Sequence, residues 1–186
     1  MSTTPPRTLL DACVLFPSVL REILLDVARG GGFTPLWSAR ILAEWQLAAA
    51  RKGDPAAAFA QAEIARLRAE WPAAEIPADP ALESHLSLPD PADRHVLAAA
   101  ITGGATQIVT LNLRDFPRRS LAPEGVSALS PDDFLMALWL QHPALVETAA
   151  AQTQLRTEAA SARPQPLRAL LKRAKLPRLG KALGTP

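Results

Sequence analysis

Short apolar runs alternate with longer helix-like segments over the first 135 residues, and this alternation most constrains the fold. The runs that read as strands are residues 7–11, 33–37, 74–76, 107–110 and 126–129. Between them, apolar residues recur at helical spacing, most clearly over residues 17–29, 38–52 and 90–102. Strands interleaved with helices predict a parallel sheet that is covered by helices on both faces.

Several of the helix-like segments begin with a polar residue followed by proline. The pairs are Asp54-Pro55, Asp79-Pro80, Asp90-Pro91 and Ser130-Pro131. In each pair the polar side chain can accept hydrogen bonds from free backbone amides, and proline suits the first helical position. These aspartates are therefore expected to act first as helix caps, and Ser38 is expected to cap the helix over residues 38–52.

The composition is that of a folded soluble protein. The chain has 186 residues, of which 48% are hydrophobic and 20% charged, enough for one globular domain with an appendage. No apolar stretch reaches the roughly 18 residues that a membrane helix needs, and the N-terminus lacks the pattern of a secretion signal. The one cysteine, Cys13, excludes an internal disulfide. We therefore expect a cytoplasmic protein without a membrane partner.

The net charge of +2 hides an uneven distribution. Residues 163–186 contain seven basic residues and no acid, whereas the rest of the chain carries 13 basic against 18 acidic residues. A basic tail on an acidic body suggests contact with an anion such as nucleic acid, or else a solvated tail that rests on the body. Leu167, Leu170, Leu171 and Ala174 have helical spacing, so this tail is expected to be disordered or to form a helix only on binding.

Four acidic residues are hard to explain by solubility alone. Asp11 ends the first strand-like run, Glu44 lies within an apolar helical pattern, Asp93 opens a helix, and Asp115 follows a later strand. Because parallel sheets bind ligands beyond the carboxyl ends of their strands, these acids can converge there. Oxygen ligands without His or Cys suit Mg²⁺ or Mn²⁺, and such sites support metal-assisted phosphodiester hydrolysis.

Four strings in order resemble the motifs of the PIN-domain family. They are LLDACVL at residues 9–15, WSxxILxE at 37–44, LPDPADRHVLAAA at 88–100 and IVTLNLRDFP at 108–117. The resemblance extends over residues 7 to about 135. It implies a doubly wound α/β sheet of about five parallel strands flanked by helices. A PIN-like domain would then occupy residues 1–135, a C-terminal helical extension 136–162, and a basic tail 163–186.

The resemblance also implies an activity, a site and partners. It points to a Mg²⁺- or Mn²⁺-dependent endoribonuclease similar to VapC-type toxins, which act on RNA, are inhibited by a cognate antitoxin and can form homodimers. By position, Asp11, Glu44 and Asp93 match the three core acids and Asp115 matches the fourth. Asn112 stands where many relatives have aspartate; its amide could complete the ligand set or orient a water, and one metal or two remain possible.

Some assignments near this site stay open on the sequence alone. Arg94, Arg114 and Arg118 could bind RNA phosphates or could be ordinary surface arginines. His95 is expected to be a structural, partly buried histidine, because a metal-activated water needs no general base. The alternative functions are a non-catalytic PIN-like module that binds RNA or protein, and a nuclease that acts on DNA flaps.

Overall fold

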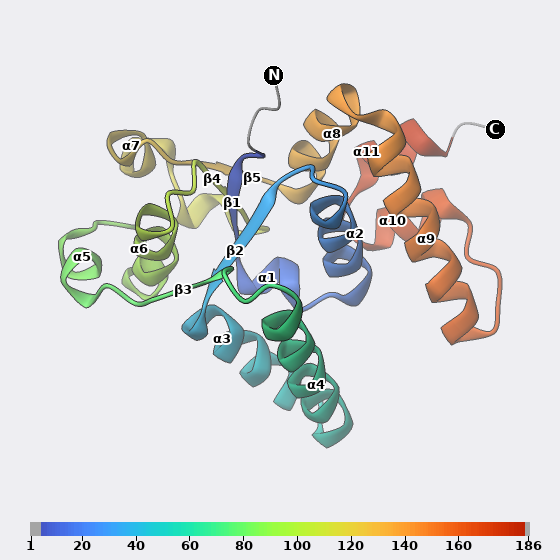
Figure 1. The fold of residues 1–186 in the computed structure, drawn as a ribbon, viewed down its shortest axis with the longest axis horizontal. Helices are drawn as coiled ribbons and strands as arrows, with labels where there is room; N and C mark the ends of the chain where they lie inside the picture. Colours follow the sequence, from blue (N-terminus) through green and yellow to red (C-terminus); the bar gives the residue numbers. More distant parts are fainter. Residues whose placement is uncertain (1–4, 185–186) are drawn as a thin grey trace.

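The core of the fold is a sheet of five parallel strands (Figure 1). A computed structural model describes residues 5–184. The strand order is β3-β2-β1-β4-β5, with strands β1 (Arg7–Leu10), β2 (Thr34–Ser38), β3 (Glu75–Ile76), β4 (Gln107–Val109) and β5 (Ser127–Leu129). All neighbouring pairs are parallel. The predicted α/β class and its five parallel strands are confirmed.

Helices cover both faces of the sheet. Those of the first 121 residues are α1 (Ala12–Leu15), α2 (Ser18–Arg29), α3 (Ala39–Ala50), α4 (Asp54–Glu70), α5 (Pro80–His85), α6 (Arg94–Thr102) and α7 (Arg118–Leu121). Short 3₁₀ turns are formed by η1 (Pro91–Asp93), η2 (Leu113–Asp115) and η3 (Ala122–Glu124). Helix α6 packs on one face of the sheet, and α2 lies on the other (Figure 1).

The strand order makes the sheet doubly wound. The chain runs outward from β1 to β2 and β3, then returns to the other side of β1 for β4 and β5. The switch in direction therefore lies between β1 and β4, where such folds bind their ligands. Leu10 pairs with Val109 at the ends of these strands, and the Asp11 amide donates to the Val109 carbonyl at 3.1 Å.

Four of the five predicted helix caps are confirmed. The side chains of Ser38, Asp79, Asp90 and Ser130 each accept a hydrogen bond from a backbone amide at the start of a helix or 3₁₀ turn. The prediction for Asp54 is wrong. Gly53 takes the cap position with a φ of 107°, a conformation that favours glycine, so Asp54 is already the first helical residue.

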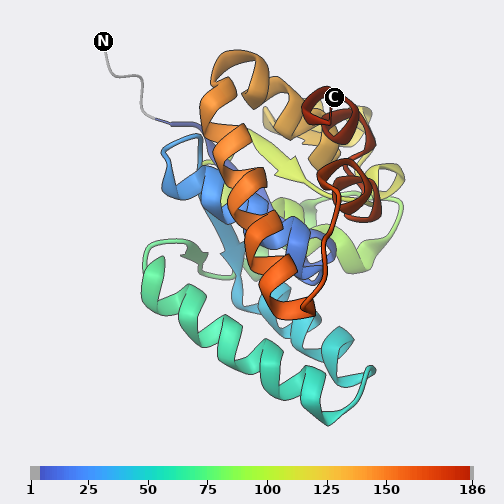
Figure 2. The ribbon, with the colours of Figure 1, turned by 90° about the vertical axis from the view of Figure 1, so that its right-hand side faces the viewer.

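The C-terminal part of the chain packs onto the body. It forms α8 (Pro131–Gln141), α9 (Pro143–Ser161), α10 (Leu167–Arg173) and α11 (Pro177–Leu183). Figure 2 shows α9 lying across α2, with α10 and α11 beside it. Among the described residues, no helix has the length and apolar character needed to cross a membrane.

The expectation that the tail is disordered or folds only on binding is wrong for residues 167–183. Leu171, Leu176 and Leu179 are fully buried and belong to the same hydrophobic cluster as the sheet. Asp132 of α8 fixes the start of α11, because its carboxylate accepts from the amides of Arg178 at 2.8 Å and Leu179 at 3.0 Å. The sequence showed the helical spacing of these leucines. It did not show that α8 and α9 provide an apolar surface that covers them. The last two residues of the predicted tail, 185–186, lie outside the described residues.

Candidate functional site

Asp11 lies at the switch point and is tightly held. It follows β1 and caps α1, with Oδ1 accepting from the Ala12 amide at 2.7 Å. Its Oδ2 accepts from the Thr110 hydroxyl at 2.7 Å and from the Cys13 thiol at 3.1 Å. Only 7% of Asp11 is exposed. Because Thr110 directly follows β4, its bond to Asp11 joins the ends of the two strands on either side of the switch point.

Cys13 connects three parts of this corner. Besides its contact with Asp11, its sulfur lies 3.4 Å from the Thr110 hydroxyl and accepts from the Leu111 amide at 3.2 Å. Burial, followed by the negative charge of Asp11, raises the pKa of the Cys13 thiol to about 12. The side chain therefore stays a neutral thiol that can donate to Asp11. On the sequence Cys13 reads only as a small buried residue, and its place two positions after Asp11 was the available signal.

Asp93 shows that several carboxylates converge. It ends the 3₁₀ turn that leads into α6, and its pKa is raised to about 6. Burial is the largest cause, followed by the negative charges of Asp11, Asp90 and Asp115. Like charges shift a pKa this way only when they lie close together. The fold therefore brings three of the four predicted acids, Asp11, Asp93 and Asp115, into one electrostatic cluster.

Glu44, the fourth predicted acid, is directed toward α6. Its Oε1 lies 2.8 Å from Nε2 of His95 and 3.7 Å from Nε of Arg40, and 39% of its side chain is exposed. His95 is 6% exposed, and neither ring nitrogen has a well-aligned hydrogen bond within residues 5–184. Glu44 therefore reaches the start of α6, two residues from Asp93, and the expectation of a buried histidine is confirmed.

The loop after β4 carries Asn112 and Asp115. The backbone amide of Asn112 donates to the Thr110 hydroxyl at 3.0 Å, and the backbone carbonyl of Asn112 accepts from the Asp115 backbone amide at 3.0 Å. These bonds fix the backbone and leave the exposed Asn112 side chain free to turn toward a ligand. Asp115 is 23% exposed and lies 3.7 Å from the Arg114 guanidinium.

The oxygen atoms of the four acids and Asn112 are of the kind that binds a hard divalent cation, although the structure does not place them around a common point. In the part of the chain that the structure describes, no three His, Cys, Asp or Glu side chains are close enough to hold a metal ion. Both Asp11 oxygens are occupied by protein donors instead. Without a cation, repelling carboxylates are expected to turn toward such donors, so the ligand set stays a prediction. Carboxylates and an amide oxygen are the ligands that Mg²⁺ and Mn²⁺ prefer.

The three predicted phosphate-binding arginines differ in exposure. Arg114 has 90% of its side chain exposed, and Arg118 is exposed at the start of α7. Arg94 is partly buried, and its Nε has no hydrogen-bond partner among the described residues. Arg94 directly follows Asp93 in the sequence, and Arg114 and Arg118 lie on either side of Asp115. Their role in binding stays a prediction.

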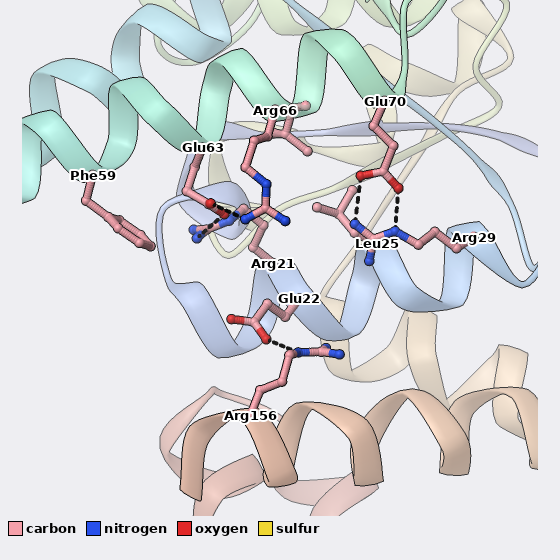
Figure 3. A pocket seen from close by; sticks show the side chains of 10 residues that line it. Arg21, Glu22, Leu25, Arg29, Phe59, Glu63, Arg66, Glu70 and Arg156 are labelled. Carbon is pink, nitrogen blue, oxygen red and sulfur yellow. Dashed lines mark hydrogen bonds and ion pairs between the residues drawn. The ribbon is translucent and has the colours of Figure 1, made fainter. Parts of the chain in front are cut away.

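A second charged region, which the sequence did not indicate, contacts the C-terminal end of α1 through Arg21. A hollow of about 510 Å³ lies between α2, α4 and α9 (Figure 3). On its wall Arg21, only 1% exposed, donates to the carbonyls of Leu15 at 2.7 Å and Phe16 at 3.2 Å. Its guanidinium lies 4.6 Å from the Trp45 ring, and burial lowers its pKa. Arg21 thus holds the end of α1, whose beginning Asp11 caps.

The other charges around this hollow are paired. Arg29 forms two bonds to Glu70, one of them 2.8 Å long, and Arg156 donates to Glu22 at 2.7 Å (Figure 3). These pairs tie α2 to α4 and α9. The ion pairs around the hollow therefore hold the three helices together, and none of the four predicted acids lines it.

Comparison with known proteins gives two matches. A family model described as "PIN domain" matches residues 7–114. A protein of Mycobacterium tuberculosis (strain ATCC 25618 / H37Rv) named "Putative ribonuclease VapC50" is 57% identical over 44 residues. That match spans 24% of this chain and only 26% of the relative's own length. No solved structure matches the chain.

Proposed function

Because this chain belongs to the PIN-domain family, we propose that it is a metal-dependent endoribonuclease whose active site is the carboxylate cluster at the switch point. The observation that carries the proposal is the place of Asp11, which follows β1 at the switch point and accepts from Thr110 after β4; the pKa of Asp93, raised to about 6 by burial and by three neighbouring aspartates, supports it. Such mutual repulsion is relieved by a bound cation. A cluster of this kind, at the place where doubly wound sheets bind ligands, suits a metal-dependent reaction better than a structural role.

The proposed ligands are Asp11, Glu44, Asp93 and Asp115, with Asn112 completing the set or orienting a water. When bound, Mg²⁺ or Mn²⁺ would lower the pKa of a water and neutralise charge on the phosphate. Thr110 and Cys13 fix the orientation of the Asp11 carboxylate, which would keep one ligand preorganised.

The protein's arginines have a separate part in the proposal. Arg94, Arg114 and Arg118 would bind phosphates on either side of the scissile bond. Attack by water with departure of the 3′ oxygen would leave a 5′-phosphate and a 3′-hydroxyl on the products.

We extend the proposal to the biological role. The name of the partial relative supports a ribonuclease of the VapC type. On this basis the chain would be a toxin that acts on RNA in the cytoplasm and is inhibited by a cognate antitoxin. Homodimer formation is part of the same expectation. The rival function, a non-catalytic module, has a physical weakness: without a cation to bind, the protein would be more stable if one of the repelling carboxylates were lost.

The test is cleavage of a pool of single-stranded RNAs by the full chain with Mn²⁺ or Mg²⁺. We expect EDTA to abolish cleavage and Asp11→Asn to reduce it by at least about 100-fold, because that substitution removes a charge that holds the metal. Asp54→Asn is the matched control, since the same change falls on an exposed first-turn residue of α4. Cleavage that survives both EDTA and Asp11→Asn would overturn the proposal, and cleavage of DNA alone would favour the flap-nuclease alternative.

A further inference from the structure

The C-terminal helices form a compact basic unit. Residues 163–181 contain Arg163, Arg168, Lys172, Arg173, Lys175, Arg178 and Lys181, and all seven are exposed. The unit is fixed in place by its buried leucines and by the Asp132 contacts to the start of α11. The two helices also touch closely: a Cβ on Gly180 would lie 3.1 Å from Leu171 Cβ and 3.2 Å from the Arg168 carbonyl. The backbone that carries these cations is therefore ordered and packed against the rest of the protein.

Most of these cations lack an acidic partner, whereas several arginines of the body are paired. Arg29, Arg68 and Arg156 each form an ion pair with a glutamate. Among residues 5–184, Arg178 is the one cation of the basic unit with an acidic partner, Asp133, and Arg173 bonds to the neutral side chain of Gln165. Arg163, Arg168, Lys172, Lys175 and Lys181 form no ion pair within residues 5–184. Exposed positive charges without a partner in the protein can bind an external polyanion.

Lys175 lies in the turn that joins α10 to α11. It has a φ of 64°, the left-handed conformation in which glycine is the usual residue after a helix. Ala162, after α9, has a similar φ of 53°, so the conformation belongs to the turn and not to the charge. Glycine can therefore replace Lys175 without disturbing the backbone, which removes the cation alone.

We propose that α10 and α11 form a preordered binding surface for the phosphate backbone of single-stranded RNA. The apolar face of the two helices is buried against α8 and α9, so they present cations but no apolar surface that could enter a membrane. This inference takes RNA from the proposed function, and it adds a surface outside the carboxylate cluster that holds the substrate without reading its sequence.

The test compares RNA binding by two variants that lose the same charge. Lys172→Gln with Lys175→Gly removes two unpaired cations of the basic unit, and neither side chain is buried. The control, Arg51→Gln with Lys52→Gln, removes two exposed cations from the turn between α3 and α4. Affinity for a labelled single-stranded RNA is measured in EDTA by fluorescence anisotropy between about 50 and 200 mM salt.

We expect the slope of log affinity against log salt to become less steep by about 1.4 in the Lys172/Lys175 variant, at about 0.7 per lost phosphate contact. At 0.1 M salt this corresponds to a roughly 25-fold weaker affinity. The control should retain nearly wild-type binding, and the midpoint of thermal unfolding should not fall in the Lys172/Lys175 variant.

Three results would overturn the proposal: wild-type protein that does not bind RNA in EDTA, an RNA affinity that falls no more in the Lys172/Lys175 variant than in the control, or a variant that loses affinity for phosphatidylserine vesicles, measured in parallel, but not for RNA. Each is separable from the nuclease proposal, because cleavage is measured independently with Mn²⁺. Binding without cleavage would refute the nuclease alone, and cleavage with unchanged binding in the variant would refute the basic surface alone.

Discussion

Replacing Asp93 by asparagine should stabilise the metal-free protein while abolishing its activity. The folded state holds this carboxyl at a pKa of about 6, against an ordinary value of 3.8, because burial and three aspartates oppose its charge. Asparagine has the same shape without the charge, so Asp93→Asn removes the repulsion. A proposed metal ligand that weakens its own fold fits the common compromise between stability and function.

The pH dependence fixes the sign of this effect. Below about pH 3 the carboxyl is largely protonated in both the folded and the unfolded chain, so its charge costs the fold little. As pH rises toward 6, the unfolded chain releases the proton first, and stability falls by linkage. Well above pH 6 the full penalty applies, so the gain from Asp93→Asn should be largest at pH 8 and only about a fifth as large at pH 4.

The magnitude follows from the pKa. A rise from 3.8 to about 6 corresponds to about 3 kcal/mol if it is fully expressed. Asp93 is only partly buried, so screening by solvent reduces the expected gain to roughly 1 kcal/mol. In a chain of this size that is an increase of about 2–4 °C in the midpoint of thermal unfolding.

The assay is thermal unfolding at pH 4 and pH 8, with EDTA or with Mg²⁺. Mg²⁺ should raise the midpoint of the wild type but not that of Asp93→Asn, because the ion relieves a repulsion that the variant lacks. Asp54→Asn serves again as the control and should leave the midpoint unchanged or slightly lower, since its carboxylate favours the start of α4. A variant that melts at or below the wild type at pH 8, or that gains equally at pH 4, would refute this reasoning.

Two further predictions concern single contacts. Cys13, with a pKa of about 12, should react with iodoacetamide at pH 8 on the order of 1000-fold more slowly in the folded protein than in urea, and equal rates would contradict its burial beside Asp11. Asp132→Ala should lower the free energy of unfolding by about 2–3 kcal/mol in urea titrations, because it leaves the Arg178 and Leu179 amides without their acceptor. Asp133→Ala, which removes an exposed ion pair, should cost less than about 1 kcal/mol, and similar losses for both would show that Asp132 is no anchor.

The sequence predicted the features that depend on neighbouring residues. Strand runs, helical spacing and the caps at Ser38, Asp79, Asp90 and Ser130 follow from local chemistry, and the structure confirms them. It also singled out Asp11, Asp93 and Asp115, because carboxylates beside apolar runs need an explanation. Their charges interact in the structure, and their role as ligands stays a prediction.

Long-range contacts were beyond the reach of the sequence. Neither the pairing of Glu44 with His95 nor the three contacts of Cys13 is visible before the sheet brings distant segments together. The leucines of the tail posed the same difficulty, because their burial depends on helices α8 and α9. Asp54 failed for a local reason, since the preceding glycine could take the cap position first.

The packing of α9 across α2 determines when, during synthesis of the chain, the core can be completed. All four proposed ligands lie within the first 115 residues, yet α2 and the sheet are covered partly by helices from the last 50. At 5–20 residues per second, synthesis of those 50 residues takes roughly 2.5 to 10 s. During that interval the growing chain carries every carboxylate of the site on an incompletely covered core. Full activity is therefore expected only after α9 has been made and has packed on α2.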